Sequence, residues 1–163
     1  MNKLFSVIIM ALAIVLKIFS GIACALHISA LVPGSLAASV AFHQVFHVGW
    51  LHLIVNLSCL VTIVFGGFRI PGSAVLAGYI ISSLVYLPAV LLAGAPTVGL
   101  SGIVYALLGM ISIHAVKKLQ YHGWIAGFLI LGFFTSSNVY LHLFAYLAGI
   151  FYAWMVTPKY DRQ

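Results

Sequence analysis

Long apolar stretches, separated by short breaks that contain prolines, glycines and most of the charges, follow one another along this chain. Of its 163 residues 64% are hydrophobic and only 5% are charged, whereas about 25% of the residues of a soluble domain are charged. A bilayer core needs about 20 apolar residues per helix, so a chain of this length accommodates about six spans. The sequence therefore predicts an all-α membrane protein.

The predicted architecture is a polytopic membrane helical bundle, a single domain over residues 1–163 with six transmembrane helices. Pro88 lies inside the third stretch, where a membrane helix tolerates it. Lys17 interrupts the first stretch, and a cation near mid-membrane costs about 3 kcal/mol unless it faces water or the bundle interior. The six predicted spans cover about residues 4–26, 46–65, 74–93, 101–116, 124–134 and 140–155.

The basic residues indicate the orientation. Six of the seven fall at ends or loops that an even number of crossings places on the same side, so the positive-inside rule predicts that both termini are cytoplasmic. The three loops on the other side, which we expect to face outward, contain no Lys or Arg. The six residues are Lys3, Arg69, Lys117, Lys118, Lys159 and Arg162.

The chain contains one acidic side chain, Asp161, near its C-terminus. Paired-carboxylate hydrolysis, an HExxH zinc site and carboxylate-driven proton coupling all need acids inside the membrane, so these chemistries are excluded. A Ser-His-Asp triad on the outer side is excluded for the same reason. We expect no cofactor, no bound metal and no nucleic-acid partner.

Four polar residues fall at a similar depth, near the outer ends of three predicted spans. Ser101 begins the fourth span within Gly99-Leu100-Ser101-Gly102, and His142 lies near the start of the sixth. His52 and Asn56 are four residues apart, so they share one face of the second span. Faces of small residues let two membrane helices approach closely and would bring Ser101 toward His142. The small residues are Gly102 and Ala106 on the fourth span, and Ala145, Gly149 and Ala153 on the sixth.

Taken singly, each of these residues has a simpler explanation. A lone Gly-x-Ser-Gly in an apolar chain is more often a packing motif than a catalytic one, and a lone histidine or asparagine often forms an interhelical hydrogen bond. Together they predict a Ser-His dyad, with Ser101 as the nucleophile and His142 as general base and then general acid. His52, Asn56 and the Ser101 backbone N–H are the candidate oxyanion donors, and Gly99 leaves that backbone accessible.

These motifs resemble the rhomboid family of intramembrane serine proteases. The second span contains His47-Val-Gly-Trp-Leu-His52-Leu-Ile-Val-Asn56, similar to the family's histidine followed by His-x-x-x-Asn. Gly99-Leu-Ser101-Gly-Ile-Val-Tyr105 resembles the nucleophile motif and its following tyrosine. His142-Leu-Phe-Ala-Tyr-Leu-Ala-Gly149 resembles the sixth-span His-x-x-Gly-x-x-x-Gly, with Ala145 in place of the first glycine. The resemblance covers about residues 46–154.

The resemblance implies the fold and activity of a small six-span bacterial rhomboid. It implies that Tyr105 stacks against His142 and that His47 supports the outer end of the second span. The implied substrate is a single-span membrane protein, cut within or near its membrane segment, in a site that opens to the outer side of the bacterial inner membrane. Partners are then the substrate and the lipid bilayer, and the oligomeric state is left open.

Three alternatives stay open from the sequence. A second alignment of the sixth span places Tyr146 at the position of the base, which predicts an inactive enzyme. A catalytically inactive rhomboid-like protein that binds membrane segments is the alternative function. A histidine-lined metal or haem protein is the third, because His43 and His47 are spaced to share one helix face.

Overall fold

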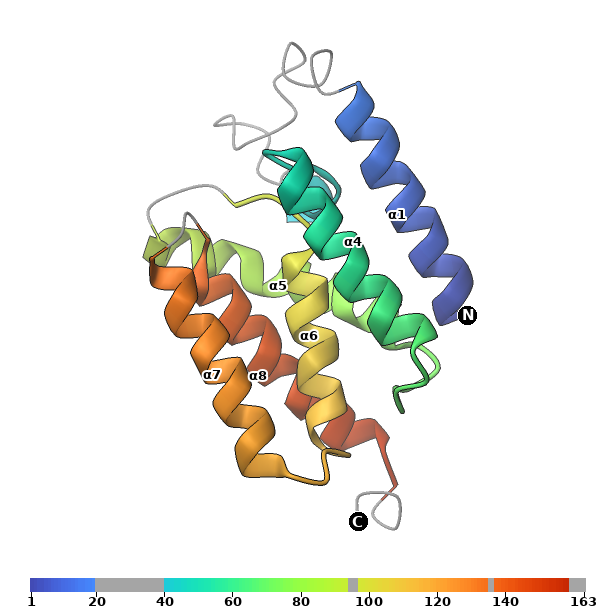
Figure 1. The fold of residues 1–163 in the computed structure, drawn as a ribbon, viewed down its shortest axis with the longest axis vertical. Helices are drawn as coiled ribbons and strands as arrows, with labels where there is room; N and C mark the ends of the chain where they lie inside the picture. Colours follow the sequence, from blue (N-terminus) through green and yellow to red (C-terminus); the bar gives the residue numbers. More distant parts are fainter. Residues whose placement is uncertain (20–39, 94–96, 135–136, 159–163) are drawn as a thin grey trace.

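The structure, a computed structural model, describes residues 1–19, 40–93, 97–134 and 137–158, and all regular secondary structure in these ranges is helical (Figure 1). The described part of the chain is therefore an all-α bundle. Its elements are α1 (Asn2–Ile18), the short 3-10 helix η1 (His43–Val45), α4 (Trp50–Phe65), α5 (Ala74–Ala93), α6 (Ser101–Ser112), α7 (Lys118–Phe133) and α8 (Val139–Val156).

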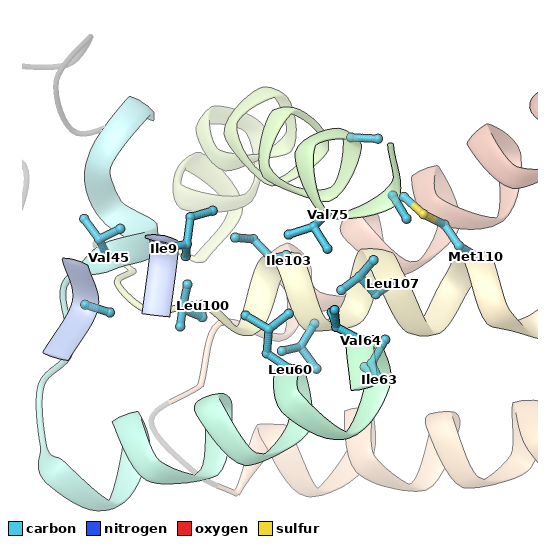
Figure 2. Close-up of a cluster of buried hydrophobic side chains, with 14 of the residues drawn as sticks. Ile9, Val45, Leu60, Ile63, Val64, Val75, Leu100, Ile103, Leu107 and Met110 are labelled. Carbon is cyan, nitrogen blue, oxygen red and sulfur yellow. The ribbon is translucent and has the colours of Figure 1, made fainter. Parts of the chain in front are cut away.

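Helix α6 is the centre of the bundle. Of its residues only Tyr105 and Leu108 are not buried. It packs on α8 and α5 over most of its length and also contacts α4 and α7 (Figure 1). Apolar side chains of several helices converge on it (Figure 2). They include Ile9 of α1, Leu60 and Ile63 of α4, Val75 of α5, and Ile103 and Leu107 of α6 itself.

Two glycines allow the close approach of α6 and α8. A methyl group added to Gly149 would lie 2.1 Å from the carbonyl oxygen of Ala106, and one added to Gly109 would lie 2.1 Å from that of Tyr146. The contact between Ala106 and Gly149 follows the pattern of small residues in the sequence. Gly102 instead faces α5, where an added methyl would lie 2.1 Å from Ser82 Oγ.

Helix α5 has the predicted bounds, but α1, α4, α6 and α7 begin or end elsewhere, and α1 ends at Ile18. Helix α4 begins at Trp50 rather than near residue 46, because the chain is extended at Phe46 (φ −90°, ψ 147°) after η1. Helix α6 ends at Ser112 rather than near residue 116, and α7 begins at Lys118 rather than near residue 124. Hydropathy marks where a segment is apolar, whereas a helix continues wherever its backbone hydrogen bonds do, so α7 includes a polar first turn.

Helices α5 and α8 are long and apolar enough to cross a membrane, and α4 and α6 are apolar but shorter. This finding is consistent with association with a membrane, and the number of six spans stays a prediction. Residues 20–26 of the first predicted span lie outside the described residues. Lys159, Asp161 and Arg162 lie outside them as well.

Candidate active site

Ser101 and His142 meet where α6 and α8 begin. The Ser101 Oγ and His142 Nε2 atoms are 2.9 Å apart, and both residues are buried. Asn138 caps α8, since its side chain accepts a hydrogen bond from the Leu141 N–H at 3.0 Å. This cap fixes the first turn of α8 and with it the position of His142. A serine hydroxyl at this distance can donate its proton to an imidazole nitrogen.

Tyr105 holds the plane of the His142 ring. It lies one turn after Ser101 on α6, and the two rings stack with centroids 4.3 Å apart and an interplanar angle of 11°. Ser101 contacts the edge of the imidazole at Nε2 while Tyr105 covers its face. The ring is thus constrained in two directions.

The backbone at Gly99 lets His52 approach the start of α6. Gly99 has a φ of 124°, a conformation that favours glycine, and a methyl group there would lie 2.7 Å from His52 Cε1. Its N–H donates to the His43 carbonyl oxygen at 2.9 Å. Any other residue at position 99 would strain the backbone and displace the His52 ring.

His47 connects the segment before α4 to the start of α6. Its Nε2 accepts a hydrogen bond from the Leu100 N–H at 3.3 Å, and its ring packs edge-on against His52 with centroids 5.2 Å apart. Burial, and to a lesser degree the neighbouring His52, lowers the pKa of His47 to about 4. The imidazole is therefore neutral at neutral pH, as an accepting Nε2 requires. His47 thus positions the residue that precedes Ser101.

A cavity of about 620 Å³ opens beside Ser101 and His142, which line it together with His52. Its other walls are largely apolar. Asn56 does not line the cavity: it is buried one turn further along α4, where its amide donates to the His52 carbonyl oxygen at 2.9 Å. One of its two N–H groups stays available. The remaining residues that line the cavity include Val48, Leu51, Val55, Thr97, Val98 and Asn138.

Tyr146 lies away from Ser101, on the side of α8 that faces α7. Its hydroxyl is 2.7 Å from the Nδ1 atom of His122. Of the two residues that the alternative alignments put at the base position, His142 contacts Ser101 and Tyr146 does not.

Lys17 contacts the segment before α4 that contains His47, a contact that the sequence did not identify. It lies in the last turn of α1, and its ammonium group donates to the carbonyl oxygens of His47 at 3.2 Å and Val48 at 3.0 Å. The described helix α1 ends at Ile18, so Lys17 lies at its end and not in its middle, and the depth of Lys17 in a membrane stays a prediction. A single cation interrupting an apolar stretch was the available signal, but its partners lie about thirty residues away in the chain.

The histidines proposed as metal ligands have protein partners. The His43 Nδ1 is 3.0 Å from the Val40 carbonyl oxygen and its Nε2 is 3.4 Å from Ser82 Oγ, while His47 accepts from Leu100. Within the described ranges no group of three or more His, Cys, Asp or Glu residues is placed to hold a metal ion. Comparison of the sequence with protein-family models gives no match, and comparison with curated proteins gives no match either.

Proposed function

We propose that this protein is an intramembrane serine endopeptidase of the rhomboid type. The observation that carries the proposal is the 2.9 Å contact between Ser101 Oγ and His142 Nε2 at the wall of a cavity. The stacked Tyr105 adds support, because a general base must be held in one orientation to accept a proton efficiently.

In the proposed reaction Ser101 Oγ attacks the carbonyl carbon of the scissile peptide while His142 Nε2 takes the hydroxyl proton. The C–N bond of the tetrahedral intermediate then breaks, and His142 gives the proton to the leaving amine. Water, deprotonated by His142, hydrolyses the acyl-enzyme and regenerates Ser101. No carboxylate takes part, since the described residues contain none.

The oxyanion of the intermediate needs hydrogen-bond donors close to Ser101. The Ser101 N–H begins a helix and has no acceptor within it, and the His52 ring lines the same cavity. The third candidate is the unused N–H of Asn56, one turn away on the same helix as His52, which reaches the oxyanion if its amide turns from the His52 carbonyl toward the cavity. These are the donors we assign to the oxyanion.

The proposed setting is a bacterial inner membrane crossed by six helices, α1 and α4 to α8, with cytoplasmic termini. Arg69 and Lys117 lie in the connections at the other end of the bundle from Ser101, which, by the positive-inside rule, supports a cavity that opens to the outer side. The proposed substrate is a single-span membrane protein cut in or near its membrane segment.

The test is labelling of the detergent-solubilised protein with a fluorophosphonate probe, together with cleavage of a panel of single-span substrates. Wild type should label and cleave, while Ser101→Ala and His142→Ala should do neither. Ser112→Ala makes the same change at the opposite end of α6 and should retain both activities. Failure of the wild type to label or cleave would overturn the proposal, and binding of substrates without labelling would favour the inactive binder.

A further inference from the structure

A second cavity, of about 470 Å³, lies at the end of the bundle away from Ser101. It is open to the surface and lined by the connection between α4 and α5, by the turn between α6 and α7, and by the first two turns of α7. Arg69, His114 and Lys117 line it together with the indole of Trp124. Two cationic side chains from different connections therefore face the same space.

The described residues contain no Asp or Glu, so Arg69 and Lys117 have no side-chain carboxylate partner among them. Cations grouped around a cavity attract an anion, and Arg and Lys are the side chains that proteins use to bind phosphate. Trp124 is 65% exposed, as is typical of an indole at the level of lipid headgroups.

An apolar groove of about 310 Å³ adjoins the basic cavity, and the two share Phe68, Ile111 and Tyr121 as walls. Cys59 and Thr62 of α4 form one side of the groove. The opposite side belongs to α6, and its residues are Val104, Leu108 and Ile111.

Tyr121 fixes the junction between cavity and groove. Its hydroxyl donates to the Leu108 carbonyl oxygen at 2.7 Å, which ties the first turn of α7 to α6. The groove runs from this junction between α4 and α6. Its α6 wall is aliphatic, and its α4 wall consists of Ile63 and the small side chains of Ser58, Cys59 and Thr62. A polar, cationic space thus continues into an apolar one.

We propose that the basic cavity and the apolar groove form one binding site for an anionic phospholipid. The phosphate binds at Arg69 and Lys117, and an acyl chain occupies the groove beside Cys59 and Thr62. Basic pockets next to membrane helices bind lipid headgroups in this way. A free phosphate would use only the basic half, whereas the adjoining groove favours an amphiphile. The site uses no residue of the Ser101 cavity.

The experiment is native mass spectrometry of the delipidated protein in neutral detergent, with lipids of identical acyl chains. Phosphatidylglycerol should be retained in preference to phosphatidylcholine. Replacement of one cation should weaken this preference about fivefold, and replacement of both about 25-fold. Arg69→Gln with Lys117→Gln tests this, and Lys118→Gln is the matched control, because Lys118 is the next residue but does not line the cavity.

The groove is tested separately by filling it. Thr62 is exposed, so Thr62→Trp should leave the fold intact while its indole displaces the acyl chain and weakens phosphatidylglycerol binding. Val61→Trp adds the same side chain one position earlier on α4, outside the groove, and should bind as wild type does. Thermal melts of all variants verify that they are folded.

Three results would overturn the proposal. They are equal retention of the two lipids, an effect of Lys118→Gln as large as that of the double variant, and unchanged binding by Thr62→Trp. If glycerol phosphate saturates the basic cavity and Thr62→Trp leaves binding unchanged, the site is one for free phosphate and not for a lipid. The assay measures lipid binding and not proteolysis, so its failure leaves the proposed protease activity unaffected.

Discussion

Helices α6 and α7 are consecutive in the chain and both are rich in apolar residues, yet they occupy opposite environments (Figure 1). Nearly all of α6 is buried, whereas α7 buries only Ile125 and Gly132. On α7 the side chains of Trp124, Phe128 and Leu131 are more than half exposed. A bilayer around the bundle would cover these exposed side chains, which is how the proposed membrane setting accounts for them.

Glycine packing explains why α6 is central and α7 peripheral. Gly102 and Gly109 of α6 each abut a neighbouring helix so closely that one methyl group would overlap it. Gly123 and Gly127 of α7 have nothing within 4 Å of an added methyl. Glycines therefore bring helices together only where another backbone uses the space, and that contact in α6 also positions Ser101 beside α8.

The largest expected effect comes from Gly109→Ala compared with Gly127→Ala. The new methyl at residue 109 would meet backbone atoms of Tyr146 and Ile150, at a cost of about 3 kcal/mol. The same change at residue 127 meets open space and gains helix propensity. The midpoint temperature of thermal unfolding and the protease activity should both decrease in Gly109→Ala, and neither should decrease in Gly127→Ala. Equal values for the two variants would contradict the packing explanation.

Gly99→Ala tests the entry to α6 with less effect on the fold. The positive φ costs about 1–3 kcal/mol for alanine, and its methyl would displace the His52 ring. If His52 donates to the oxyanion, kcat should fall about 100-fold. Steady-state kinetics and a melting curve separate the two effects, and a wild-type kcat would remove His52 from the proposed mechanism.

Lys17→Met tests whether α1 supports the segment before α4, which contains His47. The variant keeps a long, flexible, unbranched side chain but loses both hydrogen bonds to the backbone before α4. Because Lys17 is half-exposed, we expect a loss of about 1 kcal/mol and a severalfold decrease in kcat. Lys17→Arg should restore activity, and Lys3→Met on the same helix should have no effect on it. A decrease in stability with unchanged kcat would make Lys17 purely structural.

The smallest expected effect is that of Tyr146→Phe. It removes the contact with His122 that links α8 to α7, which should lower the free energy of unfolding by about 1 kcal/mol. Its activity should stay close to that of the wild type, since Tyr146 does not contact Ser101. Loss of activity in this variant, with retained activity in His142→Ala, would reassign the base.

Several features of the fold and site could be predicted from sequence because they depend on local pattern. The apolar stretch from Ala74 to Ala93 coincides with α5, and the small residues anticipated the contact of Ala106 with Gly149. The start of α7 could not be predicted from hydropathy, because its first turn is polar. The orientation of Asn56 could not be predicted either, since its amide turns to the carbonyl of its own helix.

The sequence by itself determined the all-helical, apolar character of the protein and the limits on its chemistry. With Asp161 as the only acidic side chain, a histidine is the base that the sequence offers to Ser101 in the proposed mechanism. The tertiary structure decided which histidine contacts the serine, and it showed that Lys17 joins α1 to the segment that holds His47. These contacts join residues far apart in the chain, so they depend on how closely the helices pack, which no local pattern specifies.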